Sequence, residues 1–141
     1  MDYNSDFRYD LKLGQLGETF VAQLFASKLV EVKFDFGTYR TGNFYIEYES
    51  RGVPSGIATT QADYWMLIAA SEKGLRHKQN IGTLEADDVL YCIFMHVSEL
   101  KERCRKNFYR RDVPGGDDNT SLGLLIKVEK LFVPAVYGVG N

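Results

Sequence analysis

The sequence has few of the residues that build covalent cores or transition-metal sites, with two cysteines and two histidines among 141 residues. Cys92 and Cys104 lack the short paired spacing of a zinc site or a redox motif. His77 and His96 have no partner at metal-ligand spacing and are not placed to activate a cysteine. A zinc site and a cysteine nucleophile are therefore not expected, and two reduced cysteines are typical of a cytosolic protein.

Long apolar runs are also missing, and a signal peptide is not expected. No uninterrupted apolar stretch approaches the roughly 18–20 residues that cross a membrane. The first ten residues, MDYNSDFRYD, contain acids and no apolar core, unlike a signal peptide. A hydrophobic content of 45% suits one domain with a core. We expect a single soluble domain over residues 1–141, with residues 1–13 as an N-terminal arm, in the cytoplasm.

Charge is nearly balanced, at a net −2, but positive charge is concentrated in one stretch. Residues 101–111, KERCRKNFYRR, contain six Lys or Arg and one Glu. A local basic strip of this kind is what binding to a phosphate backbone requires. Lys101 and Arg105 lie four apart on a predicted helix, and a solvated helix surface is the alternative interpretation.

Hydrophobic periodicity predicts a mixture of helices and strands. In chain order the predicted elements are a helix over 14–28, strands over 30–35 and 44–50 joined by a turn at 41–43, strands over 64–70 and 89–97, a helix over 98–108 and a strand over 121–132. A helix through Ser71 competes with the strand over 64–70, because a short apolar run does not distinguish the two. This order predicts an α/β fold with a mixed central β-sheet flanked by helices.

Charged side chains alternate along the two strands of the predicted hairpin. Lys33 and Asp35 share one face of the first strand, and Glu47 and Glu49 share one face of the second. A tight turn would bring Asp35 opposite Glu47, and carboxylates held that close repel unless a cation lies among them. Two carboxylates, waters and a phosphate are how magnesium is usually held, so the pattern predicts phosphodiester hydrolysis. The alternative is a solvated strand face paired with basic side chains.

The motifs resemble the PD-(D/E)XK nuclease superfamily, which includes restriction endonucleases and Holliday junction resolvases. The matching residues are Glu18 in GQLGETFVAQLF, Asp35 in VEVKFD, Glu47-Tyr48-Glu49 in the second strand and Gln61 in TTQADYW. The resemblance implies a restriction endonuclease-like core in which Asp35 and Glu47 hold Mg²⁺ or Mn²⁺ with the main-chain carbonyl of Tyr48. It also implies that Glu18 binds the metal through water or holds a second ion.

The sequence departs from the superfamily where a lysine is usual, because Glu49 gives a Glu-x-Glu variant of the motif. Some members similar in this respect remain active. Lys33 shares a face with Asp35, and its long stem can place an ammonium near the missing one. We hypothesise that Lys33 or Glu49 orients the attacking water. Apart from the resemblance, Glu18 is a first-turn acid that suits the helix dipole, and Gln61 is a turn or cap residue.

The function that the resemblance implies is a Mg-dependent endodeoxyribonuclease acting on branched, phage or repair DNA in the cytoplasm of a bacterium or a phage-infected cell. The residues expected to bind DNA are Lys101, Arg105, Lys106, Arg110, Arg111, Asn119 and Ser121. Asn119 and Ser121 belong to a polar loop, and the alternative interpretation is that this loop has no part in DNA binding. A homodimer is expected, because a small protomer brings one site to two strands. An inactive nuclease-fold protein that binds DNA or assembles, and an interaction module with a charged sheet face, are the other interpretations.

Overall fold

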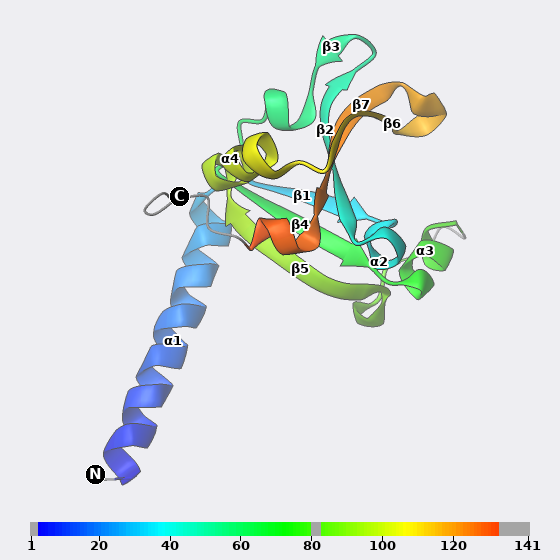
Figure 1. Ribbon diagram of the computed structural model, residues 1–141. Coiled ribbons are helices and arrows are strands. Elements are labelled where there is room, and N and C mark those ends of the chain that lie inside the picture. Colours follow the sequence, from blue (N-terminus) through cyan, green and yellow to red (C-terminus); the bar gives the residue numbers. More distant parts are fainter. Residues whose placement is uncertain (1–2, 80–82, 133–141) are drawn as a thin grey trace.

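The computed structural model describes residues 3–79 and 83–132 and has the predicted mixed α/β composition (Figure 1). The helices are α1 (Tyr3–Ser27), α2 (Thr38–Thr41), α3 (Glu72–Gln79) and α4 (Val97–Asn107). The strands are β1 (Val30–Asp35), β2 (Asn43–Ser50), β3 (Val53–Pro54), β4 (Tyr64–Ala70), β5 (Val89–His96), β6 (Arg110–Gly115) and β7 (Ser121–Lys127). Short 3-10 helices lie at η1 (Gly56–Ala58), η2 (Ala86–Asp88), η3 (Asp117–Asn119) and η4 (Val128–Leu131).

The strands form two sheets and not the single central sheet that the sequence predicted. The first sheet has the order β1-β4-β5, in which β1 is parallel and β5 antiparallel to β4. The second is antiparallel throughout, with the order β3-β2-β7-β6. The parallel pair needs a long connection between β1 and β4. That connection contains β2, β3 and η1, which belong to the second layer.

The predicted hairpin of residues 30–50 is wrong, because β1 and β2 belong to different sheets. The chain between them forms the short helix α2, which ends at Gly42 in the left-handed conformation (φ 73°). Glycine adopts this conformation without the clash that other residues meet. β1 then pairs with β4, and β2 pairs with β7. The turn signal at 41–43 therefore marks a helix end that redirects the chain.

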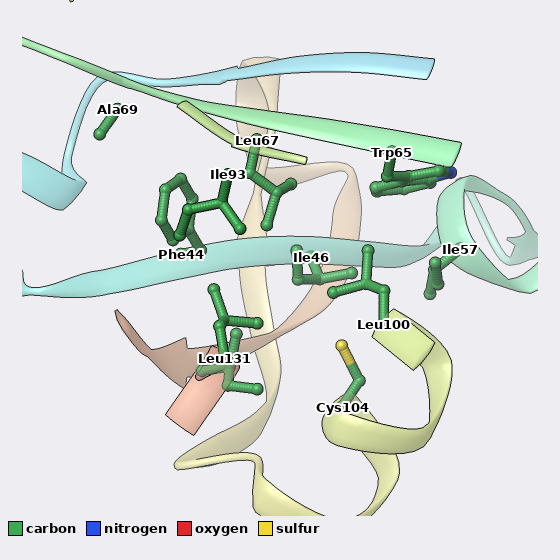
Figure 2. Packing of buried hydrophobic residues seen from close by; sticks show 11 residues of the cluster. Phe44, Ile46, Ile57, Trp65, Leu67, Ala69, Ile93, Leu100, Cys104 and Leu131 are labelled. Carbon is green, nitrogen blue, oxygen red and sulfur yellow. The ribbon is translucent and has the colours of Figure 1, made fainter. Parts of the chain in front are cut away.

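The core lies between the two sheets and under α4 (Figure 2). Its buried members are Phe44, Ile46, Ile57, Trp65, Leu67, Ala69, Ile93, Leu100, Cys104, Ile126 and Leu131. They come from β2, η1, β4, β5, α4, β7 and η4, so residues far apart in the sequence share one apolar layer. The layer holds the two sheets together because apolar area removed from water stabilises by about 25 cal/mol per Å².

Several predicted elements form close to their expected bounds. β4 and β5 confirm the strands over 64–70 and 89–97, and the competing helix through Ser71 is wrong. Helix α4 begins at Val97, where the side chain of His96 caps it by accepting a hydrogen bond from the Ser98 N–H (3.2 Å). Residues 110–115, which had no predicted element, form β6. The predicted last strand ends early because the chain turns into η4.

Helix α1 extends away from the rest of the protein, on the side opposite the four-stranded sheet (Figure 1). Residues 1–13 were expected as an arm, and from Tyr3 onward they form the first part of this helix. Its C-terminal end is anchored, because Leu24 is buried and the Phe25 ring centroid lies 5.7 Å from that of Phe94. Beyond the helix, Leu29 N–H donates to the Asp63 carboxylate (3.0 Å), and Asp63 N–H donates to the Leu29 carbonyl (2.9 Å).

Candidate functional site

Three of the predicted site residues meet at one surface pocket of about 360 Å³. They are Lys33 on β1, Glu47 on β2 and Gln61 in the loop before β4. The remaining lining residues are Leu29, Val30, Glu31, Gly56, Thr59, Thr60 and Ala62. The pocket therefore lies where the first half of β1 meets the loop that follows β3.

Lys33 is held by Glu31, a residue that the sequence analysis did not single out. The distance between Lys33 Nζ and Glu31 Oε1 is 2.8 Å, and Nζ lies 5.5 Å from the centroid of the Trp65 ring. Strand alternation was the available signal, since it places Glu31 on the same face as Lys33. This face points inward, whereas Val32 and Phe34 are exposed. The face of β1 that points inward is therefore the charged face and not the apolar one.

Glu47 is fixed by the loop that follows β3. Ser55 Oγ donates a hydrogen bond to Glu47 Oε2 (2.9 Å), and Ser55 N–H donates to the Tyr48 carbonyl (3.0 Å). The carbonyl predicted as a metal ligand is thus bonded to the loop. Gly56 has φ +55°, and a Cβ on it would lie 2.2 Å from the Glu47 carbonyl oxygen. Glycine is required for this close approach, which places Glu47 at the pocket wall.

A β-bulge separates Glu47 from Glu49. In the pairing with β7, Glu47 lies opposite Gly123 while Glu49 lies opposite Leu122, so strict alternation ends at Tyr48. The expectation that both glutamates share a strand face is wrong for this reason, and Glu49 is not among the residues that line the pocket.

The Tyr48 hydroxyl donates to the Asp112 carboxylate. Partial desolvation and this hydrogen bond raise the pKa of Tyr48.

Asp35 binds main-chain N–H groups with both of its carboxylate oxygens. Oδ1 accepts from Gly37 (2.8 Å) and Thr38 (3.0 Å), and Oδ2 accepts from Tyr45 (2.8 Å). The side chain therefore caps α2 and joins β1 to β2 across the two sheets. It does not line the pocket with Glu47. The expected arrangement, with Asp35 opposite Glu47 in one hairpin, is wrong because the two strands do not pair.

The structure does not bring Glu18 to the pocket. Glu18 is exposed on α1, the helix that extends away from the two sheets (Figure 1). Among residues 3–79 and 83–132, no three His, Cys, Asp or Glu side chains come together as a group that could hold a metal ion. The acidic residues that line the pocket together with Lys33 are Glu31 and Glu47.

The basic residues predicted to bind DNA form an exposed strip on α4 and β6. Its members are Lys101, Arg105, Lys106, Arg110 and Arg111. Glu102 forms ion pairs with Arg105 and Lys106, so part of this charge is neutralised within the helix. Of the two loop residues, Asn119 is exposed, but Ser121 is only 5% exposed at the start of β7. The predicted contact of the Ser121 hydroxyl with DNA is wrong, because the strand buries it.

Comparison of the chain with protein-family models, with curated proteins and with solved structures found no match in any of the three. In the part of the chain that the structure describes, no helix is long and apolar enough to cross a membrane. The interpretation therefore depends on the pocket itself, which combines two carboxylates, an ammonium, an amide and threonine hydroxyls. Such a set offers hard oxygen ligands for a cation beside a positive charge for a phosphate.

Proposed function

We propose that the protein is a metal-dependent DNA endonuclease with a restriction endonuclease-like site in the pocket of Lys33, Glu47 and Gln61. The observation that carries the proposal is the meeting of these three residues, from separate segments, around one pocket. Glu31-Val32-Lys33 adds an acid-x-lysine spacing, which the superfamily motif has and which the Glu47-x-Glu49 segment lacks. The lysine that the Glu47-x-Glu49 segment lacks is then supplied by β1, with Glu31 as its partner.

The two carboxylates at the pocket suit Mg²⁺ or Mn²⁺. Magnesium is usually bound through one or two carboxylates, while waters and substrate phosphates complete its coordination. Glu47 and Glu31 would hold the ion in this way, and Ser55 limits the rotation of the Glu47 carboxylate. Bound there, the ion would activate a water and neutralise charge that builds on the phosphorus.

The side chains around the pocket supply the other requirements of phosphodiester hydrolysis. The Lys33 ammonium donates hydrogen bonds to the attacking water or to a phosphate oxygen, and Glu31 positions it. The Gln61 amide donates to a phosphate oxygen. The strip of Lys101, Arg105, Lys106, Arg110 and Arg111 binds the DNA backbone by charge. A homodimer brings two such sites to the two strands of one DNA molecule.

Supercoiled plasmid and a four-way DNA junction, each incubated in Mg²⁺ and in Mn²⁺, test the activity. We expect nicking or resolution by the wild type and a loss of at least about 100-fold in Glu47→Gln and Lys33→Ala, as is common for groups that act in the transition state. The matched controls are Glu129→Gln and Lys130→Ala, which change exposed residues of η4. Equal activity in Glu47→Gln and Glu129→Gln contradicts the proposed site.

The basic strip has its own test, in which DNA affinity is measured as a function of salt concentration. Lys101→Ala is expected to weaken binding equally for all DNA sequences and to reduce the slope of log K against log salt by about 1. Lys12→Ala, on α1, is the control of equal charge. An unchanged slope in Lys101→Ala excludes this surface as the binding site.

A second candidate is a DNA-binding or assembly protein with the same fold and no activity. The observation that favours it is that Asp35, the first acid of the motif, binds three main-chain N–H groups. It predicts binding to DNA at low salt with no cleavage in any divalent metal. Absence of DNA binding at low salt excludes both candidates and leaves a protein-interaction module.

A further inference from the structure

Helix α1 carries an apolar stripe that the described part of the protein does not cover. The stripe consists of Tyr9, Leu13, Leu16, Phe20 and Leu24, which recur every three or four residues and so lie on one side of the helix. The first four are between 49% and 65% exposed. Of the side chains described in residues 6–27, Leu24 alone is buried.

A helix of this composition needs a packing partner. Helices in water gain most of their stability from packing of an apolar face, and each glycine inside a helix costs about 1 kcal/mol relative to alanine. α1 contains Gly14 and Gly17, and a Cβ at either position would meet nothing within 4 Å. The anchor at Leu24 and Phe25 stabilises only the last turns. The first four turns therefore require a surface that residues 3–79 and 83–132 of the same chain do not provide.

The outer face of the β1-β4-β5 sheet is a second apolar surface, and it is only partly covered. Strand pairing places its side chains in two rows, with Val32, Met66 and Phe94 in one and Phe34, Ile68 and Cys92 in the other. Val32 is 48% and Phe34 39% exposed, whereas Ile68 in the middle of the face is only 8% exposed. α1 leaves the protein beside this face, because Phe25 lies against Phe94.

We propose that two copies of the chain form a symmetric dimer in which the stripe of each α1 packs on the outer sheet face of the other copy. Each chain carries both surfaces. A two-fold axis therefore forms the helix-on-sheet contact twice, covers both surfaces of both copies and leaves neither of them for a third copy. The proposal deepens the homodimer part of the proposed function and is independent of the nuclease chemistry. Its partner is a second copy of this chain.

The size of the surfaces fits a stable dimer. α1 has 25 residues, so it is roughly 37 Å long. Three strands spaced about 4.8 Å apart, with a rise of about 3.3 Å per residue, present a face of roughly 350 Å². The helix surface that covers such a face has about the same area, so one helix and one face amount to roughly 700 Å² per copy. A standard interface buries about 800 Å² per partner.

The same helix is poorly placed to cover the sheet face of its own chain. Only Lys28 and Leu29 separate α1 from β1, and Leu29 is fixed by two hydrogen bonds to Asp63. Folding back would break the packing of Leu24 and Phe25 that sets the helix direction. A second copy meets the face without that loss.

Sedimentation equilibrium of the full chain tests the proposal. We expect the wild type to have twice the 16.1 kDa chain mass at micromolar concentration. Leu16→Asp in the stripe and Phe34→Asp on the sheet face are each expected to halve that mass. Gln15→Asp adds the same charge next to Leu16 but off the stripe, and should remain dimeric. Circular dichroism of the sheet and core establishes that the variants are folded.

A mixture of the two disruptive variants separates helix-on-sheet packing from other dimers. Leu16→Asp retains an intact sheet face and Phe34→Asp retains an intact helix, so the mixture is expected to form a heterodimer through one of the two contacts. The thiol of Cys92, which lies on the same face, should react slowly with a thiol reagent in the wild type and several-fold faster in the Leu16→Asp monomer.

Four results overturn the proposal. A wild type that is monomeric at every concentration excludes the proposed dimer. Slow labelling of Cys92 in that monomer would mean that another part of the same chain, either α1 or residues 133–141, covers the outer sheet face. A dimer that survives both substitutions forms elsewhere, so the homodimer remains and this interface is excluded. Dissociation by Leu16→Asp but not by Phe34→Asp indicates pairing of two helices. A mixture that stays monomeric excludes the reciprocal contact.

Discussion

Glu31 Oε1 lies 2.8 Å from Lys33 Nζ on the face of β1 that points toward the second sheet. Both side chains are 42% exposed, so the pair contributes only about 0–1 kcal/mol to folding. The pair matters instead for the pocket that Glu47 also lines, because Glu31 determines where the Lys33 ammonium lies in that pocket.

The ion pair predicts a separation of stability from activity. Glu31→Gln removes both a proposed metal ligand and the charge that positions Lys33, so we expect nuclease activity to fall at least about 10-fold while the free energy of unfolding changes by less than about 1 kcal/mol. Urea denaturation and plasmid nicking measure the two quantities. Glu129→Gln is the control, and a Glu31→Gln variant with full activity contradicts both proposed roles of Glu31.

Asp35 predicts a loss of stability. Asp35→Ala leaves the N–H groups of Gly37, Thr38 and Tyr45 without their acceptor, and an unsatisfied buried donor costs about 1–3 kcal/mol. We expect a decrease of this size in the free energy of unfolding, measured in urea. Asp10→Ala, in the exposed part of α1, should change it by less than about 0.5 kcal/mol. If Asp35→Ala and Asp10→Ala are equally stable, the hydrogen bonds of Asp35 do not stabilise the junction of β1, α2 and β2.

Gly56 predicts a coupled effect on the loop and on Glu47. A Cβ at this position meets the Glu47 carbonyl oxygen at 2.2 Å, so Gly56→Ala is expected to destabilise by about 1–3 kcal/mol and to weaken Mn²⁺ binding in calorimetry. Gly52→Ala separates strain from clash. Gly52 also has a positive φ (+82°), but a Cβ there meets nothing within 4 Å. Gly52→Ala should therefore destabilise while leaving Mn²⁺ binding unchanged.

Asp88 predicts acid sensitivity. It is fully buried, and the hydrogen bond from the Glu85 N–H lowers its pKa below 3.8, helped by His77 at 2.8 Å. A lowered folded-state pKa stabilises the protein above 3.8, and this contribution is lost as the pH falls below that value. Calorimetry of Asp88→Asn should give a lower Tm at pH 7 and a smaller decrease of Tm in acid. Asp118→Asn, which changes an exposed acid of η3, should retain the wild-type pH profile.

Cys104 predicts an unreactive thiol. Burial raises its pKa to about 12, so the sulfur stays protonated at neutral and mildly basic pH. In a Cys92→Ala variant, we expect no labelling by a thiol reagent at pH 8 in the native state and one labelled thiol after unfolding. Rapid native labelling means that Cys104 is not part of the closed core.

Local patterns predicted the elements and not their partners. Branched and aromatic residues identified β4 and β5 within one residue, because a run of that length and composition suits a buried strand. The sequence does not encode pairing as simply, since Thr41-Gly42-Asn43 suits both a hairpin turn and a helix end. α2 and Gly42 at its end direct the chain so that β2 joins the other sheet. The hydrophobic periodicity of residues 30–50 does not indicate this change of sheet.

The candidate site was predicted in part for the same reason. Lys33 and Glu47 were named from strand alternation and Gln61 from the resemblance to the nuclease motifs, and all three line one pocket. Asp35 was assigned to metal from its spacing to Glu47, a relation that holds only if the strands pair. Glu31 was missed although it alternates with Lys33, because the face of β1 that points inward depends on β4.

Leu29 belongs both to the wall of the pocket and to the joint at the base of α1. A change in the angle of the helix is therefore passed to the wall through a single residue, which is held by Asp63 near Gln61. If docking of α1 favours one shape of the pocket, a ligand that prefers this shape strengthens docking by the same free energy. In that case the proposed site and the proposed dimer would be thermodynamically linked through the main chain of Leu29.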